Sequence, residues 1–267
     1  MALLTLSNIH KTFEKGTVNE NHVLRGLDLD IEQGDFISVI GGNGAGKSTL
    51  MNSIAGVVDI DKGDILLEGE SIRKASVSAR SKDISRVFQD PRMGTATNLT
   101  IEENMAIAYR RGKKRSFFKK SVTEQEHELF KETLTELGLG LENRMKTGAA
   151  FLSGGQRQAL TLAMATLVRP KILLLDEHTA ALDPKTSDMV MHLTKKIVEE
   201  QELTTLMITH NMEHAIEYGN RLIMLYHGKI VVDVHGDEKK NLTVSQLMDL
   251  FHKNSGQALN DDALVLG

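Results

Sequence analysis

The chain has 267 residues, of which 40% are hydrophobic and 25% are charged, and its formal net charge is -4 at pH 7. These values are typical of a globular protein with a substantial core, and the net charge gives no general argument for nucleic-acid binding. Because the sequence contains no cysteine, disulfides, cysteine zinc sites and thiol catalysis are excluded. The first residues lack a basic segment followed by a long apolar one, so we expect no signal peptide, and no apolar stretch is long enough to span a bilayer.

Short apolar runs bounded by turn residues predict β-strands in the first 90 residues, at 3–9, 23–31, 36–40, 65–69 and 84–88. A polar loop is expected at 14–22, between the first two strands. Pro91 follows the last of these strands, where proline ends regular pairing. A helix is predicted over 49–55, directly after the third strand, and Gly56 can end it.

Helical patterns dominate between residues 91 and 150. Thr100 with Glu103, and Thr123 with Glu126, fit the capping box, in which side chains and backbone N–H groups satisfy each other at the start of a helix. The second of these helices is expected to end at Gly138. This segment therefore predicts a helical lobe inserted into an α/β domain.

A basic cluster lies within this lobe and consists of Arg110, Arg111, Lys113, Lys114, Arg115, Lys119 and Lys120. A block of like charge usually stays in water, and we therefore interpret the cluster as a solvated loop. The alternative is contact with anionic lipid headgroups beside a membrane partner.

Strands and helices alternate after residue 151. Strands are predicted at 172–175 and 204–208, and as a pair within 221–234 that is joined by His227-Gly228. Helices are predicted from about 154 to 168, from Asp183-Pro184 onward, at 212–218, and after Thr243, with residues 254–267 as a loosely held tail. The alternation indicates a mostly parallel sheet with helices on both faces.

The segment Gly41-Gly42-Asn43-Gly44-Ala45-Gly46-Lys47-Ser48 fits the phosphate-binding pattern G-x-x-x-x-G-K-[ST] at every fixed position. Its glycines let successive N–H groups converge on one anion, Lys47 supplies a positive charge for terminal phosphates, and the Ser48 hydroxyl can bind Mg²⁺. A strand precedes it and a helix follows through Thr49, so the helix dipole favours the same anion. These flanks argue against the alternative, a glycine-rich turn that happens to contain Lys-Ser.

Asp176 and Glu177 follow the apolar run at 172–175. A carboxylate at the carboxyl end of a buried strand lies where open α/β sheets bind ligands, and Asp176 can there hold Mg²⁺ directly or through water. Glu177 is suited to polarise an attacking water. An ordinary acidic pair at a strand end is the alternative, and the glycine loop in the same chain argues against it.

The segment Leu152-Ser153-Gly154-Gly155-Gln156 resembles the signature sequence of the ATP-binding subunits of ABC transporters, and it is much more specific than a phosphate loop. Ser153 is placed to cap a helix, and the glycines let its backbone approach an anion. A second anion-binding surface in one chain makes sense if each surface serves a different nucleotide across a dimer. The alternative is a serine-capped helix with no further role.

The resemblance extends from Phe13 to about Val234 and implies roles for further residues. Phe13 stands where the family has an aromatic residue, more often tyrosine, that stacks on adenine; a plain core position is the alternative. Gln89 matches the glutamine that links the metal and the attacking water to the helical lobe. Asp183 matches a loop that communicates across the dimer, and His210 matches the switch histidine that contacts the γ-phosphate.

Two positions depart from the family pattern. Gly42 stands where proline is frequent in the phosphate loop, and His178 follows Glu177 where proline is usual. The first position is variable and should matter little, whereas the second could alter the stiffness of the loop beside the water site.

The resemblance implies an α/β fold: a P-loop NTPase (RecA-like) core with an antiparallel β subdomain and an inserted helical lobe. The core is expected at 1–90 and 151–235, the helical subdomain at 91–150, and a short C-terminal helix with a tail at 236–267. The implied activity is hydrolysis of ATP with Mg²⁺ in a head-to-tail homodimer. The implied partners are transmembrane permease subunits at the cytoplasmic face of the cell membrane and, indirectly, an extracytoplasmic substrate-binding protein.

The sequence as a whole is similar to those of ATPases of bacterial importers, some of which carry amino acids or related small molecules. A soluble ABC-type ATPase acting on nucleic acid or ribosomes is an alternative, but such relatives carry long coiled coils, zinc cysteines or two ATPase units, and we expect no nucleic-acid partner here. A simple P-loop kinase is a further alternative, and it leaves residues 152–156 unexplained.

Overall fold

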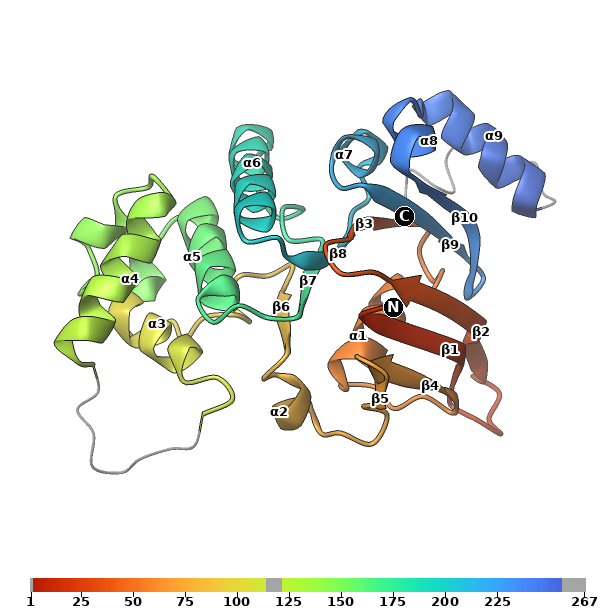
Figure 1. Ribbon diagram of the computed structural model, residues 1–267, viewed down its shortest axis with the longest axis horizontal. Coiled ribbons are helices and arrows are strands. Elements are labelled where there is room, and N and C mark those ends of the chain that lie inside the picture. Colours follow the sequence, from red (N-terminus) through yellow and green to blue (C-terminus); the bar gives the residue numbers. More distant parts are fainter. Residues whose placement is uncertain (1, 114–121, 256–267) are drawn as a thin grey trace. The chain divides into compact units, whose positions relative to one another are not determined.

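The computed structural model describes residues 2–113 and 122–255, and the chain divides into two compact units (Figure 1). The first unit comprises Met1–Arg80 and Thr204–Gly267, and the second comprises Ser81–Leu203. Each unit is built around its own strands and helices. The residues singled out in the sequence are divided between them.

An antiparallel sheet in the first unit has the strand order β2-β1-β4-β5. Buried leucines of β1 alternate with partly exposed polar residues up to Asn8, which has a φ of 49°. The register with β2 shifts between Leu6 and Ile9, so that Ile9 returns to the core as expected of a β-bulge. The strands are β1 (Leu4–Phe13), β2 (Asn21–Ile31), β4 (Lys62–Leu67) and β5 (Glu70–Ser71).

A second group of strands in the first unit surrounds β3 (Phe36–Ile40), which pairs in parallel with β8 (Thr204–Ile208) and β9 (Arg221–Tyr226). The strand β10 (Lys229–His235) adds to β9 in antiparallel. All residues of β3 and β8 are buried, as expected of parallel strands covered on both faces. The helices of this unit are α1 (Lys47–Ala55), α2 (Val77–Arg80), α7 (Met212–Glu217), α8 (Gly236–Lys240) and α9 (Val244–Ser255).

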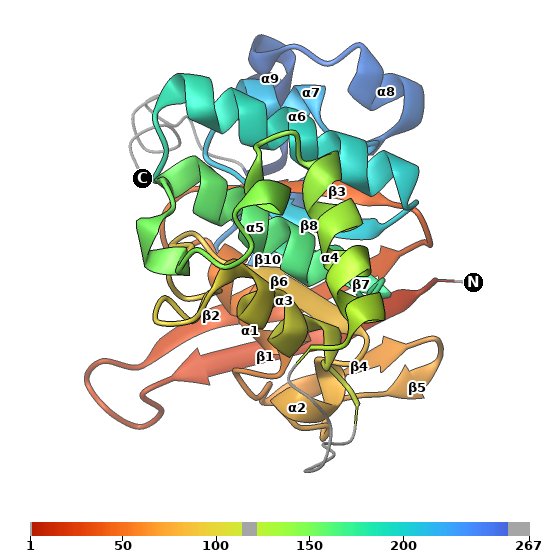
Figure 2. The ribbon, with the colours of Figure 1, turned by 90° about the vertical axis from the view of Figure 1, so that its left-hand side faces the viewer.

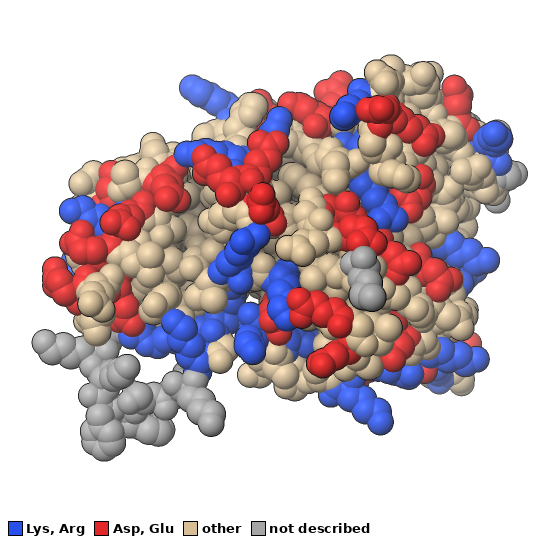
Figure 3. Space-filling view, in the orientation of Figure 1, with Lys and Arg blue, Asp and Glu red and all other residues tan. Residues whose placement is uncertain are grey.

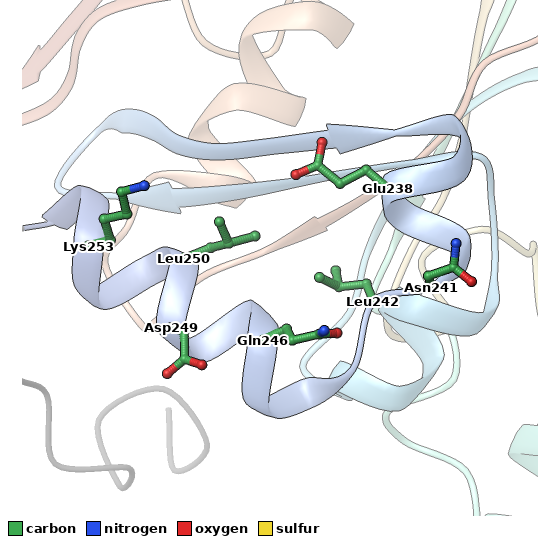
Figure 4. Close-up of a pocket in the computed structure, with 7 residues that line it drawn as sticks. All are labelled: Glu238, Asn241, Leu242, Gln246, Asp249, Leu250 and Lys253. Carbon is green, nitrogen blue, oxygen red and sulfur yellow. The ribbon is translucent and has the colours of Figure 1, made fainter.

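The C-terminal helices close part of the core of the first unit. Leu247 and Phe251 of α9 are buried in a cluster with Leu222, Met224 and Val232 of the adjoining strands. A hollow of about 370 Å³ opens beside α8 and α9 (Figure 4). It is lined by Glu238, Asn241, Leu242, Gln246, Asp249, Leu250 and Lys253, none of which was singled out as a site residue in the sequence.

The second unit contains one parallel pair of strands, β6 (Ile84–Val87) and β7 (Ile172–Asp176). Its helices, seen from the side in Figure 2, include α3 and α4, and the predicted capping boxes are present at Thr100 and Thr123. Ser153 and Gln156 form another capping box at the start of α5. The helical elements are α3 (Ile101–Tyr109), α4 (Glu124–Glu136), η1 (Leu141–Asn143), η2 (Ala149–Phe151), α5 (Gly154–Thr166) and α6 (Pro184–Glu200).

The strands and most helices predicted from the sequence are confirmed, with shifted ends. Strand β1 runs on to Phe13, since the bulge at Asn8 keeps it paired beyond the predicted end at residue 9. The short helices α2 and α8 were not predicted, because they are too short to show a periodic pattern. Helix α9 extends through Asn254 to Ser255, and the rest of the predicted tail lies outside the described residues.

The interpretation of the basic cluster as a solvated loop is wrong for Arg111. Its guanidinium donates to the carbonyls of Ala165 and Val168 at the end of α5, and burial lowers the pKa of this side chain. Arg110 pairs with Glu126 at 3.3 Å, and Lys113 lies over the ring of Tyr109. The remaining members, Lys114, Arg115, Lys119 and Lys120, lie outside the described residues.

Across residues 2–113 and 122–255, no helix is both long enough and apolar enough to span a membrane.

Candidate functional site

The glycine loop in the first unit joins the end of β3 to the start of α1. A Cβ at Gly41 would lie 2.3 Å from the carbonyl oxygen of Leu225, so no other residue fits there without a shift of the backbone. Gly46 has a φ of 106°, which L-residues rarely adopt. Gly42, at the position where the family often has proline, is not among the glycines with positive φ.

The two phosphate-binding elements of this loop are in place. The Lys47 side chain is 6% exposed, and its Nζ donates to the carbonyl oxygens of Gly41 at 2.6 Å and Gly42 at 3.2 Å. No side chain of the described part of the chain caps α1 at Gly46, so its first turn, with Ser48 and Thr49, offers N–H groups to an anion. The loop therefore combines an ammonium group with a helix N-terminus, which is the donor set that phosphate requires.

His210 lies at the same edge of the sheet as the start of the glycine loop. In the parallel pair of β3 and β8, Val39 is paired with Ile208, and Gly41 and His210 each follow two residues later. The connection is tightened by a hydrogen bond from the Thr209 N–H to the Val39 carbonyl at 3.2 Å. The first unit thus brings the histidine to the phosphate loop, at the carboxyl end of the strands, where α/β sheets bind ligands.

Phe13 is the last residue of β1 and is 37% exposed, which excludes the plain core position. Its partner in the ladder is Asn21, and the Nζ of Lys11 lies 5.1 Å from the centre of its ring. An exposed aromatic face beside a lysine can accept a planar base by stacking.

The second unit repeats this arrangement with other residues. In the parallel pair of β6 and β7, Val87 is paired with Leu175, and Gln89 and Glu177 each follow two residues later. Gln89 is exposed, whereas Asp176 and Glu177 are partly buried. The carboxyl ends of β6 and β7 therefore bring three predicted site residues to one edge of this strand pair: Gln89, Asp176 and Glu177.

Asp176 is already engaged, by a residue that was not singled out in the sequence. Arg86 of β6 forms an ion pair with the Asp176 carboxylate, and its guanidinium stacks at 4.8 Å on the ring of Phe88, next to Gln89. Gln158 of α5 donates to the Phe88 carbonyl at 3.3 Å, while its Oε1 is buried and has no hydrogen-bond partner among the residues that the structure describes. A polar Gln158 on the apolar face of a helix is a signal that sequence reasoning could have used.

The signature segment and Asp183 meet where α5 and α6 lie side by side (Figure 2). The Ser153 hydroxyl accepts from the Gln156 N–H at 3.3 Å, and the Asp183 carboxylate accepts from the Thr186 N–H at 3.2 Å. Hydrogen bonds from the Thr186 side chain and from its backbone N–H lower the pKa of Asp183. A Cβ at Gly155 would lie only 2.2 Å from the Cγ2 of Thr186, so the close packing of the two helix starts requires glycine.

The loop after Glu177 contains a further residue whose place the sequence did not explain. His178 is 2% exposed, and its Nε2 lies 3.0 Å from the Oγ1 of Thr194 in α6. Glu177 itself has a φ of 46°.

The predicted site residues thus fall into groups, each of which lies within one unit. The first unit assembles residues 41–49 with His210 and presents Phe13, and the second assembles Gln89, Asp176 and Glu177 and joins Ser153–Gln156 to Asp183. The hydroxyl of Ser48 and the carboxylate of Asp176 are hard oxygen donors, which fit Mg²⁺. Acidic and basic side chains are both spread over the face drawn in Figure 3, in agreement with the small net charge.

Comparisons with known proteins agree on one family. The family model described as ABC transporter matches residues 24–180. The tyrosine transport ATP-binding protein of Clostridioides difficile (strain R20291) is 45% identical over 249 residues, which are 93% of this chain and 98% of the relative. The phosphonates import ATP-binding protein PhnC of Lactobacillus gasseri is 34% identical over 269 residues, covering 98% of this chain and 97% of the relative.

A solved structure gives the same result. The ATP-binding cassette MJ0796, in a dimeric post-hydrolysis state bound to ADP and Pi, matches with a TM-score of 0.74 at 28% identity, over 87% of this chain and 98% of that chain. The family model covers more than half of the chain, and the relatives cover nearly all of it. The fold is accordingly a P-loop NTPase core with an antiparallel β subdomain and an inserted helical lobe. The chain belongs to the ABC transporter family, as one of its ATP-binding, ATP-hydrolysing subunits.

Proposed function

We propose that this protein is the ATPase of a bacterial importer for a small solute. Two copies bind head to tail around two ATP molecules, and hydrolysis reopens them. The motion drives permease subunits to which the protein is bound at the cytoplasmic face of the membrane. Because ATP makes its additional contacts only in the closed dimer, it shifts the equilibrium by its differential affinity for the two states.

One observation carries this proposal: the chain has two separate helix starts that suit phosphate. One is the uncapped N-terminus of α1 behind Lys47, and the other is the Ser153 capping box of α5, whose glycines let a phosphate approach the backbone. A single triphosphate needs one such cradle. A second cradle in another unit of the same chain is explained if it serves the nucleotide held by the partner copy.

The residues of the first unit bind the nucleotide in this proposal. Phe13 stacks on the adenine, and the N–H groups of residues 41–49 with the Lys47 ammonium hold the β- and γ-phosphates. His210 contacts the γ-phosphate, to which its strand register with the glycine loop brings it close. Lys47 exchanges the carbonyls of Gly41 and Gly42 for phosphate oxygens when ATP binds.

Glu177 and the residues proposed to hold Mg²⁺ carry the reaction. Glu177 polarises a water whose oxygen attacks the γ-phosphorus while the bond to the bridging oxygen of ADP breaks. Ser48, Asp176 and Gln89 would hold Mg²⁺, which neutralises charge on the phosphates when it is bound. Ser153, Gly154, Gly155 and Gln156 contact the nucleotide of the partner copy, and Asp183 lies at the same dimer interface.

The permease partner and the cargo follow from the family and its relatives. We assign the core to 1–90 and 151–235, the C-terminal helix and tail to 236–267, and contact with the permease to the helical lobe at 91–150. Relatives named for tyrosine transport and phosphonate import support import of a small polar solute, such as an amino-acid-like compound, delivered by an extracytoplasmic binding protein. Cargo is selected by those other subunits.

The variant Glu177→Gln tests the dimer and the reaction together. It should bind ATP like the wild type, lose turnover, and accumulate as a dimer with ATP in analytical ultracentrifugation. Lys47→Ala is the matched control, because it removes the phosphate contact and should stay monomeric with ATP. Only monomer for Glu177→Gln with ATP would contradict the head-to-tail mechanism.

The cargo is tested separately, with the permease that co-purifies with this subunit. In proteoliposomes containing the binding protein, uptake of labelled tyrosine is compared with uptake of a labelled phosphonate. ATP-dependent uptake that Glu177→Gln abolishes supports import. ATP-dependent efflux from the same vesicles would contradict it.

A further inference from the structure

We propose that His178 is a positioning residue for Glu177, which it holds through a hydrogen bond to Thr194 of α6. This inference rests on the proposed function in one respect, namely that Glu177 is the residue that polarises the attacking water. It adds two residues to the catalytic apparatus, neither of which touches ATP or the water itself.

His178 is the only buried residue between Glu177 and Asp183, a stretch that the structure describes in full. Its neighbours in this loop are exposed or partly buried, so the imidazole is the one fully buried side chain that anchors the loop to the body of the second unit. The ring reaches Thr194, which is fully buried. An imidazole buried in this way requires a hydrogen-bond partner, because an unsatisfied polar group inside a protein costs about 1–3 kcal/mol.

The direction of this hydrogen bond follows from the proton count at Thr194. The Thr194 hydroxyl donates its single proton to the carbonyl oxygen of Val190, at 2.8 Å. Its oxygen must therefore accept from His178, which places a proton on Nε2 of the imidazole. The hydrogen bond to the Thr194 oxygen therefore requires an N–H group at Nε2 of His178.

The backbone at Glu177 explains why such an anchor is needed. Its φ of 46° is a left-handed conformation, which costs a residue with a side chain about 1–3 kcal/mol and persists only where the surroundings hold it. A hydrogen bond from the Ala180 N–H to the Glu177 carbonyl, at 2.9 Å, closes a turn around His178 and Thr179. The direction of the Glu177 carboxylate thus depends on a turn whose one buried side chain is His178.

The loop is held by α6 at both of its ends. Asp183 caps the first turn of the helix, and Thr194 binds His178 near its middle. Glu177 directly precedes the His178 anchor, and the predicted dimer contact Asp183 lies at the other end of the loop. Loss of the His178 anchor leaves the cap intact and releases only the part of the loop that carries Glu177.

The test uses Thr194→Val, which keeps the shape of the side chain and removes the acceptor. We expect kcat for ATP hydrolysis to fall about tenfold, as for loss of one hydrogen bond, while the Kd for ATP is unchanged. Thr194→Ser retains the hydroxyl and should restore kcat. Thr166→Val is the matched control, since Thr166 is also buried and also donates within its own helix, to Leu162 at 3.0 Å, but lies on α5.

Two readouts report the anchor without any turnover. The ¹⁵N shifts of a His178-labelled protein should show protonated Nε2, and Thr194→Val should speed hydrogen exchange at 178–182 while Thr166→Val does not. Equal kcat for the two valine variants, or a proton on Nδ1 instead of Nε2, would overturn the proposal. If Glu177→Gln still hydrolyses ATP, the proposed function fails instead, and the exchange and NMR results still decide whether the anchor exists.

Discussion

Arg86 and Asp176 form an ion pair within the second unit, and each of the two side chains is only 14% exposed. Arg86 is paired with Leu174 in the strand ladder, so Asp176 is its diagonal neighbour on the same face. The carboxylate that would bind the metal is therefore balanced by a cation in the protein itself. The same guanidinium stacks on Phe88, beside Gln89.

The variant Arg86→Met should destabilise the protein and make it responsive to Mg²⁺. The partly buried Asp176 carboxylate loses its counter-ion, so the free energy of unfolding should fall by about 3 kcal/mol, the lower end of the loss for buried pairs that lose one partner. Mg²⁺ offers the alternative partner and should restore part of the loss by binding the folded state. Urea denaturation with and without MgCl₂ measures both effects.

Arg92→Met is the control for this prediction. Arg92 pairs with Asp90 at 2.9 Å, but its side chain is 70% exposed, so the change should leave the free energy of unfolding nearly unchanged and should not respond to Mg²⁺. The same Mg²⁺ response in both variants would show that Arg86 does not compete with the metal.

Gly155→Ala should disturb the packing of α5 on α6. The added Cβ would lie 2.2 Å from Thr186 Cγ2, and the strain should cost about 1–3 kcal/mol in spite of the better helix propensity of alanine. Thermal unfolding and ATPase activity measure the effect. Adding Thr186→Ser removes the clashing methyl group and keeps the hydroxyl, so the double variant should recover much of the loss.

Gly154→Ala is the matched control, since its Cβ would meet only the tip of Leu182, at 3.2 Å. It should be close to neutral in stability. Equal destabilisation at positions 154 and 155 would show that the Thr186 contact is not the cause.

Phe13→Ala should weaken ATP binding about tenfold through loss of stacking on the base, whereas Phe13→Tyr should bind like the wild type. Because Phe13 is 37% exposed, the free energy of unfolding should change little. Equilibrium titration with ATP and with inorganic tripolyphosphate separates base from phosphate contacts. An equal loss of affinity for tripolyphosphate would contradict the stacking role.

Lys239 should make stability depend on pH. Its side chain is 2% exposed, Nζ donates to the carbonyls of Ile216, Tyr218 and Gly219, and burial lowers its pKa from 10.5 to about 8. Between these two values the unfolded chain binds more protons than the folded one. The free energy of unfolding should therefore rise with pH in this window, by up to about 1.4 kcal/mol per pH unit.

Urea denaturation from pH 7.5 upward checks this slope, and Lys239→Met should abolish it. Lys240→Met is the control, because the Lys240 side chain is 76% exposed and pairs only at the surface with Asp237. Identical pH profiles for the two variants would contradict a titration of Lys239 in this range.

Most secondary structure was predictable because its causes are local. The capping boxes at Thr100 and Thr123, the serine cap at Ser153 and the glycine that ends α1 act over a few residues, and they are present in the structure as the sequence indicates. One interpretation depended on distant partners and was wrong. The interpretation of Arg111 failed because its acceptors, the carbonyls of Ala165 and Val168, lie more than 50 residues along the chain.

The amino-acid sequence by itself determined which residues we propose to bear the chemistry: the glycine loop with Lys47, the acidic pair at 176–177 and the signature segment were all identifiable from residue type and spacing. Only the tertiary structure decided which of them share a strand edge, as Gly41 does with His210 and Gln89 with Glu177. It also decided what holds them, namely Arg86 on Asp176 and Thr194 on His178. The physical reason is that motifs and caps are set by neighbours in sequence, whereas strand register and buried polar partners are set by packing between segments far apart in the chain.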